Sequence, residues 1–143
     1  MQHILKNLSA VAQSIALFRD VQLEEAGITG YQAKYLLAVF NAEGISQDGL
    51  AKRLLVNKSN VARQVGALEV AGYLKREQSA EDKRVMLVYT TDAGKGIIPL
   101  IRAANEKWKE VLCEGLSQAE REELASLLEK LVKNARGYLT ERI

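Results

Sequence analysis

Apolar residues between positions 45 and 90 recur first at helical spacing and then in two short β-prone runs. The two helical segments are joined by a turn, and a polar loop joins the two β-prone runs. In order, these parts are Gln47–Leu55, the turn Val56-Asn57, Lys58–Ala71, Tyr73–Glu77, the loop Gln78–Arg84 and Val85–Thr90. A helix, a turn, a second helix and a two-stranded ribbon with a basic tip predict a winged helix-turn-helix.

The second helical segment, Lys58–Ala71, has an apolar side and a polar side. The stripe that must face the core contains Val61, Val65, Leu68 and Gly72. The opposite side contains Ser59, Asn60, Arg63, Gly66 and Ala67. A recognition helix needs hydrogen-bonding side chains in its first turns and small residues where the backbone approaches the groove. An ordinary solvated helix would show a similar pattern, but the β-ribbon that follows favours DNA binding.

The polar loop between the β-prone runs brings Asp82, Lys83 and Arg84 together. An arginine at the tip of a ribbon can enter the minor groove, whose potential is most negative over narrow A·T tracts. A free carboxylate there would repel phosphate, so we expect Asp82 to pair with Arg84 or Arg76 and to fix its direction. The alternative is an exposed loop of mixed charge, which is common on protein surfaces.

Four more helices are predicted from spacings of three and four between apolar residues. They run from Leu5 to about Glu25, ended by Gly27; from Gly30 to Ala42; from Asp92 to about Gly115; and from about Ser117 to Tyr138 and Leu139. Candidate N-caps are Thr29, Ser46, Asn57 and Thr91, and Ser117 with Glu120 matches a capping box. Pro99 removes a backbone hydrogen bond inside its helix, so we predict a bend there.

The helices near the two ends of the chain carry more apolar surface than one small winged domain needs. In the last helix, the apolar face is widened by Leu127, Leu128, Leu131 and Val132. Such faces are best buried against a second copy of the chain. We therefore expect a mainly α protein with a small β-wing and a single domain, 1–143. Its winged-helix lobe covers about 30–90, and its dimerisation helices cover about 4–26 and 92–140.

The positive charge of the chain is concentrated in the predicted winged helix. The whole chain of 143 residues has a net charge of only +2. Residues 46–90 contain eight Lys or Arg and five Asp or Glu, whereas residues 91–143 contain nine of each kind. The excess charge therefore supports nucleic-acid binding by this lobe, although an excess of this size is modest.

Composition argues against several other classes of protein. The chain has one His, one Cys, no metal-ligand spacing, no phosphate-binding glycine loop and no nucleophile elbow, so we predict neither an enzyme nor a metal or cofactor. Its apolar runs are too short to cross a bilayer, and its first residues do not match a signal peptide. A single Cys excludes an intramolecular disulfide and fits a reducing, cytoplasmic setting.

Two kinds of residue have a structural and a functional interpretation. The aromatic residues Tyr31, Tyr35 and Phe40 fit a hydrophobic core better than a base-stacking role. Cys113 follows Val111 and Leu112 at the apolar end of a predicted helix, which favours a buried, inert thiol. A redox-sensing thiol, or a disulfide between two subunits, is the alternative at this position.

Taken together, these residues resemble the MarR family of transcription regulators over nearly the whole chain. The strongest part of the resemblance is the block NKSNVARQVGALEVAGYLKREQSAEDKRVMLVYTTDAGK. It contains a Lys-Ser pair that opens a helix, an Arg a few residues later, a Gly that ends the helix and a wing with Asp-x-Arg. The segment LSQAEREELASLLEKL also resembles the terminal dimerisation helix of the family.

The resemblance implies a homodimer that binds double-stranded DNA with its N- and C-terminal helices interlocked. It assigns five residues to the major groove and the phosphates: Lys58, Ser59, Asn60, Arg63 and Gln64. It assigns Arg84 to the minor groove, with Asp82 orienting a wing arginine, and Arg76 and Lys83 complete the DNA-binding candidates. Asn57 stands where many relatives have Asp, and both residue types can cap a helix.

The resemblance also implies a function as a transcriptional regulator, expected to be a repressor on a pseudo-palindromic operator. Many relatives release DNA when they bind a small aromatic acid between the dimerisation helices and the DNA-binding lobe. The residues that could contribute to such a pocket here are Arg19, Tyr31, Lys34, Tyr35 and Trp108, each of which also fits a core or surface role. The alternative function is a winged-helix module that contacts another protein and needs neither Arg63 nor Arg84.

Overall fold

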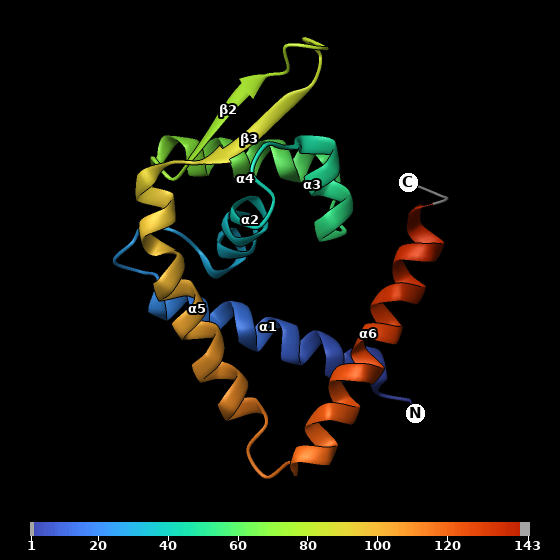
Figure 1. Cartoon of the computed structure of the whole chain (residues 1–143). Helices are drawn as coiled ribbons and strands as arrows, with labels where there is room; N and C mark the ends of the chain where they lie inside the picture. The colour runs from blue at the N-terminus through green and yellow to red at the C-terminus, as the bar shows by residue number, and fades with distance from the viewer. Residues whose placement is uncertain (1, 141–143) are drawn as a thin grey trace. The chain divides into compact units, whose positions relative to one another are not determined.

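The computed structural model describes residues 2–140, and Figure 1 shows the order of the helices and strands. These elements are α1 (Ile4–Gln22), α2 (Gly30–Phe40), β1 (Ile45–Ser46), α3 (Gln47–Leu54), α4 (Lys58–Val70), β2 (Leu74–Gln78), β3 (Met86–Thr90), α5 (Asp92–Leu112) and α6 (Gln118–Thr140). The mainly α fold with a small β-wing is therefore confirmed. The chain forms two compact units, one that ends at Trp108 and one that begins at Lys109. Within residues 2–140, no helix has the length and apolar character that a membrane span requires.

Helix α2 lies at the centre of the first unit, where it contacts α1, α3, α4 and β3 (Figure 1). Its side chains Tyr35, Leu36 and Val39 are completely buried. Around them lie buried residues of the neighbouring elements: Leu23, Ile28, Leu50, Val61, Val65, Leu68, Leu74, Val88, Ile98 and Ile101. The predicted core role of Tyr35 is confirmed, while Tyr31 and Phe40 are half-buried at the edge of this core.

The wing belongs to a three-stranded antiparallel sheet in which the strand order is β1-β3-β2. Strands β2 and β3 pair along their whole lengths, from Leu74 opposite Thr90 to Gln78 opposite Met86. The sequence predicted a two-stranded ribbon, but Ile45–Ser46 adds a third strand by pairing with β3. Two residues are too few to show a β period in the sequence, so this pairing emerges only in the fold.

Side-chain caps begin four helices of the first unit, as the sequence predicted. In each case a side-chain oxygen accepts a hydrogen bond from a backbone N–H in the first turn. The pairs are Thr29 with Gln32 (3.0 Å), Ser46 with Gly49 (2.9 Å), Asn57 with Asn60 (2.8 Å) and Thr91 with Gly94 (3.1 Å). These local bonds fix the residue at which each helix starts, including the helices of the helix-turn-helix.

The turn between α3 (Gln47–Leu54) and α4 (Lys58–Val70) is short and includes one residue in the left-handed region. Leu55 ends α3 in the left-handed region, with φ 56° and ψ 46°, which costs about 1–2 kcal/mol for a residue with a Cβ. The backbone N–H of Val56 then donates to the carbonyl oxygen of Ala51 at 3.1 Å, and Asn57 caps the next helix. The turn predicted at Val56-Asn57 is confirmed, with Leu55 as its first residue.

Several predicted boundaries differ from the structure by a few residues. Helices α1, α2 and α5 end at Gln22, Phe40 and Leu112 instead of about Glu25, Ala42 and about Gly115. The prediction that Gly72 lies on the core stripe of α4 is wrong. Gly72 is exposed, follows the end of α4 and has a φ of +87°. A glycine in this conformation ends a helix, so the helical period does not extend to it.

The first turn of α5 is held against the segment that follows α4. The hydroxyl of Thr91 donates to the carbonyl oxygen of Gly72 at 2.6 Å, and its backbone N–H donates to that of Tyr73 at 3.1 Å. Gly94 allows this close approach, because a Cβ at this position would lie 2.2 Å from the carbonyl oxygen of Tyr73. Pro99 lies inside α5, which continues to Leu112. The bend at Pro99 stays a prediction.

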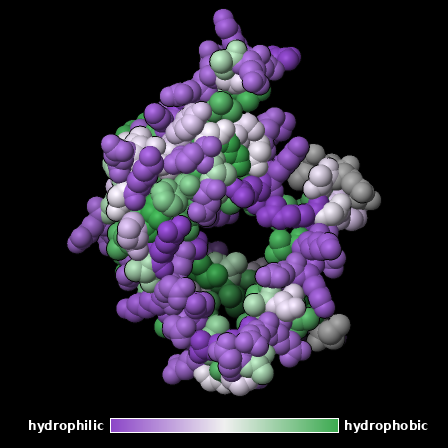
Figure 2. Space-filling view, viewed as in Figure 1, coloured by the Kyte–Doolittle hydropathy of each residue, from purple (hydrophilic) through white to green (hydrophobic). Residues whose placement is uncertain are grey.

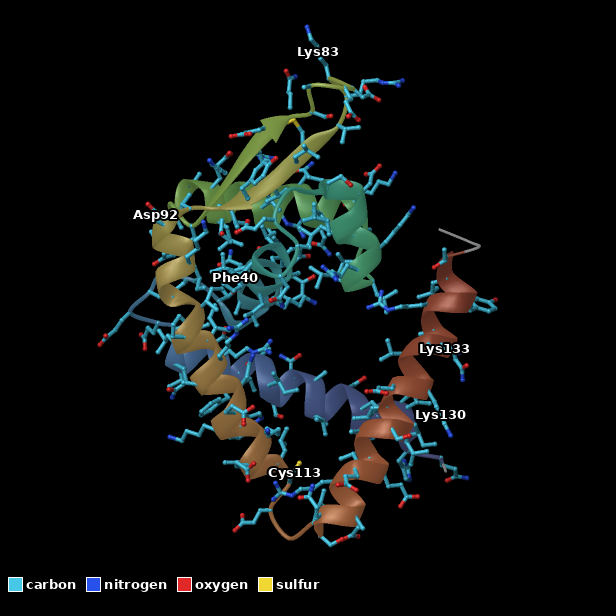
Figure 3. The ribbon with its side chains drawn as sticks, in the orientation of Figure 1. Phe40, Lys83, Asp92, Cys113, Lys130 and Lys133 are labelled. Carbon is cyan, nitrogen blue, oxygen red and sulfur yellow. The ribbon has the colours of Figure 1, made fainter. Side chains whose placement is uncertain are left out.

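The second unit contains the end of α5, a turn and α6. Ser117 and Glu120 form the predicted capping box, with bonds of 2.9 and 3.1 Å in the two directions. Arg121 holds the preceding turn, because its guanidinium donates to the carboxylate of Glu110 at 3.1 Å and to the carbonyl oxygen of Cys113 at 3.2 Å. Figure 3 shows Cys113 directly after α5. The side chain of Cys113 is half-buried, so the expectation of a buried thiol is wrong.

We predict opposite effects on stability for alanine at two glycines near the start of α5. Gly94→Ala should lower the free energy of unfolding by about 2 kcal/mol or more, because the new methyl group overlaps the Tyr73 carbonyl. Gly96 has no atom within 4 Å of its Cβ position, so Gly96→Ala should raise this free energy by about 0.5–1 kcal/mol. Urea unfolding of the two variants measures both changes. Equal effects would contradict the close packing at Gly94.

Candidate nucleic-acid interface

Helix α4 has its polar side facing outward because its apolar side is held in the core. Val61, Val65 and Leu68 are completely buried, which fixes the rotation of α4 about its own axis. Lys58, Ser59 and Arg63 are exposed, while Asn60 and Gln64 are half-buried. These five residues are the predicted contacts with the major groove, and they extend over the first two turns of α4. The structure therefore groups them at the start of α4, with Ser59 and Arg63 on the outward side and Asn60 and Gln64 closer to the core.

Hydrogen bonds order the side chains at the start of α4. The side-chain oxygen of Asn57 accepts from the hydroxyl of Ser59 at 2.8 Å and from the backbone N–H of Asn60 at 2.8 Å. The amide oxygen of Asn60 accepts a hydrogen bond from the guanidinium of Arg63. Lys58 forms an exposed ion pair of 3.5 Å with Asp48 of α3. The cationic groups of this face therefore keep a defined direction while remaining accessible to solvent.

Gln64 lies at the border between the outward side of α4 and α2. Its side-chain oxygen accepts a hydrogen bond of 3.2 Å from the amide nitrogen of Gln32. Gln32 was absent from the sequence-based candidates, although its position three residues after Thr29 matches the second half of a capping box. That spacing could have located the Gln32 amide at the start of α2, but only the fold shows its contact with Gln64.

Arg76 lies beneath α4 instead of at the wing tip. Its guanidinium donates to the carboxylate of Glu69 at 3.0 Å and to the side-chain oxygen of Gln47 at 3.3 Å. The hydrogen bonds from Arg76 hold the pKa of Glu69 below its ordinary value. Gly66 faces this guanidinium, since a Cβ at Gly66 would lie 3.6 Å from it. The side chain of Arg76 is only 27% exposed, so its charge is directed into an intramolecular contact at a less accessible place than that of Lys58 or Arg84.

The tip of the wing orients Arg84 through Asp82. The carboxylate of Asp82 accepts two hydrogen bonds of 3.1 Å from the guanidinium of Arg84 and one of 3.0 Å from its backbone N–H. These bonds lower the pKa of Asp82 and raise that of Arg84, so both stay charged over the physiological range. Of the two partners considered for Asp82, the structure thus selects Arg84. The Arg84 side chain still has 90% of its surface exposed.

The wing projects beyond the helices of the first unit. Figure 3 shows Lys83 extending from the end of the hairpin, and Figure 2 shows hydrophilic residues over this tip. Lys83 and Arg84 therefore lie on one projecting element, whereas Lys58 and Arg63 lie on α4. A polar helix face and a hairpin with a cationic tip can contact adjacent grooves of a DNA duplex.

A separate cavity of about 500 Å³ lies in the first unit between α1 and the start of α2. Its lining residues are Ser9, Ala12, Gln13, Ile15, Ala16, Arg19, Gly30, Tyr31 and Lys34. The ammonium of Lys34 lies 4.1 Å from the centre of the Tyr31 ring, which is a cation–π contact. The guanidinium of Arg19 donates to the side-chain oxygen of Asn105 at 2.7 Å. The cavity thus combines apolar walls with two cationic side chains.

Three of the five residues suggested for a ligand pocket line this cavity, namely Arg19, Tyr31 and Lys34. Tyr35 is completely buried behind them, where its hydroxyl lies 3.3 Å from that of Tyr31 and burial raises its pKa. Trp108 is absent from the lining residues and stacks on Phe18 with a centroid distance of 4.6 Å. Its ring nitrogen donates to the hydroxyl of Ser14, so Trp108 packs α5 against α1.

The outward polar side of α4 and the projecting hairpin define a winged helix-turn-helix, a class of DNA-binding fold. Residues 28–86 match the MarR family. The chain is 30% identical to a solved structure of MarR, covering 96% of this chain and 94% of that one with a TM-score of 0.88. It therefore belongs to the MarR family of transcriptional regulators.

Other relatives agree with this assignment. The chain is 27% identical to the HTH-type transcriptional regulator YybA of Bacillus subtilis, over 94% of this chain and 89% of YybA. It is 25% identical to a MarR family regulator from Listeria monocytogenes whose crystal structure includes a 26mer DNA. That alignment covers 99% of this chain and 97% of the other, with a TM-score of 0.90.

Proposed function

We propose that this protein is a cytoplasmic, homodimeric transcriptional repressor that binds a pseudo-palindromic DNA operator and releases it when a small aromatic acid binds. The observation that carries the proposal is the pairing of two cationic elements in one lobe. The outward side of α4 exposes Lys58 and Arg63, and the adjacent wing exposes Arg84 with its direction set by Asp82.

The proposed contacts of α4 are with the major groove. Arg63 has guanidinium donors suited to a guanine edge, and Asn60 and Gln64 have amide groups suited to base edges. Lys58 and Ser59 in the first turn would contact phosphate, which the backbone N–H groups at the start of a helix also favour. Asp48 pairs with Lys58 only at an exposed site, so phosphate can replace this carboxylate at little cost.

The proposed contact of the wing is with the minor groove. Arg84 is the cation that would enter it, while Lys83 would contact phosphate beside it. The Asp82 carboxylate is bonded to Arg84, and this pairing reduces the repulsion between Asp82 and phosphate. A narrow A·T tract attracts arginine most strongly, so flanks of this composition should be preferred.

A homodimer is supported by apolar surface that the chain leaves open on α6. Side chains on one side of this helix are between 37% and 61% exposed: Leu124, Leu127, Leu128, Leu131, Val132 and Tyr138. Helix α1 separately exposes Ile4, Leu5, Leu8 and Val11. Continuous apolar stripes of this kind are rarely left in water, and a second copy would bury them in a symmetric interface. Two copies would supply the two half-site contacts of a palindrome.

Release by a small aromatic acid is supported by the cavity beside α2. Lys34 and Arg19 can pair with a carboxylate, and Tyr31 and the apolar wall of α1 can pack against a ring. The same first turn of α2 that lines the cavity is hydrogen-bonded to α4 through Gln32 and Gln64. A ligand that displaces this turn would therefore disturb the helix proposed to read DNA.

The first experiment is selection from random duplex DNA followed by titration at two salt concentrations. We expect an inverted repeat with half-sites about 10 base pairs apart and affinity that falls by about 10³-fold or more between 50 and 200 mM salt. No enriched site and negligible binding at low salt would instead indicate a protein-contact module.

Arg84→Ala should weaken binding to the selected DNA by about 1–3 kcal/mol per wing and relax the preference for A·T flanks. Arg84→Lys should keep more of the affinity than of that preference.

The dimer can be tested with two lysine substitutions on α6. Leu131→Lys puts a charge on the exposed apolar side, and we expect it to weaken association by about 3 kcal/mol or more. Ser126→Lys adds the same charge on a different side of the helix, about 140° away, and should leave the dimer intact. Light scattering at micromolar concentration distinguishes the two results. A monomeric wild-type protein would exclude the proposed palindromic operator.

The ligand proposal predicts that 2-hydroxybenzoate releases the selected DNA. Lys34→Ala should raise the concentration needed for release by about tenfold, because one charge-assisted contact with the carboxylate is lost. Lys133→Ala, which removes a cation from α6, is the matched control and should release DNA at the wild-type concentration. Anisotropy of labelled operator measures release, and equal concentrations for both variants would remove Lys34 from the binding site.

A further inference from the structure

Two glutamine side chains from different helices form a half-buried amide–amide hydrogen bond. The Nε2 of Gln32, in the first turn of α2, donates to the Oε1 of Gln64, in α4, at 3.2 Å. The two residues are 32 positions apart in the sequence. This contact joins the central helix of the lobe to the helix proposed to read DNA.

The direction of this hydrogen bond follows from a backbone group. The Oε1 of Gln32 accepts from the backbone N–H of Thr29 at 3.0 Å, as part of the capping box of α2. A peptide N–H can only donate, so the oxygen of Gln32 must face Thr29 and its NH₂ group must face Gln64. An NH₂ group also only donates, so Gln64 must turn its oxygen toward α2. The orientation of both amides therefore follows from which of the surrounding groups can donate and which can accept a hydrogen bond.

We propose that Gln32 is a positioning residue that makes Gln64 present its N–H donors to DNA, so that Gln64 selects guanine over cytosine at one position of each half-site. This inference rests on the proposed operator binding. Gln32 itself need not touch DNA, since its NH₂ group contacts the oxygen of Gln64 and its own oxygen contacts the cap of α2.

The choice of guanine follows from the groups that each base shows in the major groove. Guanine presents two acceptors, N7 and O6, whereas cytosine presents only the N4 donor. A glutamine that reads adenine needs its oxygen and its nitrogen to face the base edge together. Gln64 directs its oxygen back to α2, so its NH₂ group is the part left for the groove. A donor alone matches the two acceptors of guanine, finds one acceptor on adenine or thymine, and is repelled by the donor of cytosine.

The substitution Gln32→Glu should reverse this selection. A carboxylate keeps the acceptor for the N–H of Thr29 and suits the start of a helix, so the cap of α2 should persist. The carboxylate has no donor, however, and its second oxygen would accept from the Nε2 of Gln64. The Gln64 amide would then turn its oxygen outward, where it would match the donors of cytosine or adenine. Gln32→Leu removes the donor without adding a charge and should relax the selection without reversing it.

The experiment compares relative affinities for operator duplexes that carry each base at every position of the half-site. At one symmetric pair of positions, the wild-type protein should prefer guanine over cytosine by about three- to tenfold per half-site, the expected size for one hydrogen bond. Gln64→Ala should abolish this ratio, and Gln32→Glu should bring it below one. The double variant Gln32→Glu with Gln64→Ala has the same added charge and should show no base preference at this position.

The outcomes separate this inference from the proposed function. A wild-type protein that enriches no operator would overturn the proposed function and this inference with it. An operator whose base preferences are the same in Gln64→Ala would overturn this inference alone. A guanine preference that Gln64→Ala removes, but that neither Gln32→Glu nor Gln32→Leu changes, would overturn the role of Gln32. Thermal unfolding of each variant tests whether the compared proteins are folded.

Discussion

Burial of Val61, Val65 and Leu68 against the centre of the lobe is the contact on which the candidate DNA-binding surface depends. Three fully buried side chains on one stripe of a helix leave it no freedom to rotate about its axis. The residues on the other side, among them Ser59 and Arg63, must then face solvent. The polarity of the outward face is thus a consequence of core packing, and the tight turn at Leu55 and the Asn57 cap set where that face begins.

Helix α2 has a second role beyond filling the core. Its first turn lines a cavity, is capped by Thr29 and is also bonded to α1, because the carboxylate of Asp20 accepts from the backbone N–H of Gly30 at 2.6 Å. Gly30 permits this approach, since a Cβ there would lie 2.3 Å from the carbonyl oxygen of Ala16. The hydrogen bond between Asp20 and Gly30 and the one between Gln32 and Gln64 therefore connect α1, the first turn of α2 and α4.

The ion pairs of the lobe matter more for direction than for stability. Lys58 with Asp48 and Arg84 with Asp82 are exposed, and such pairs contribute little to the free energy of folding. Their effect is to hold the Lys58 ammonium and the Arg84 guanidinium in one orientation. Arg76 differs, because its partner Glu69 and its position beneath Gly66 join β2 to α4. Net charge alone would not have separated these roles.

The parts of this protein that could be predicted from the sequence are those decided by interactions within a few residues. The caps at Thr29 and Asn57 lie within one helical turn of their partners, and Asp82 lies two residues from Arg84. Periodicity likewise located the helices, with errors of a few residues at their ends.

The tertiary structure alone decided the contacts between elements. The pairing of Ile45–Ser46 with β3, the partners of Arg76, the half-buried state of Cys113 and the bond between Gln32 and Gln64 all depend on how folded segments meet. A side chain with several donors or acceptors can satisfy them in many ways, and its choice of partner is set by whichever groups the packed core brings within about 3 Å of it. Apolar spacing carries no information about that choice, because it records which side of a segment is buried and not what lies across from it.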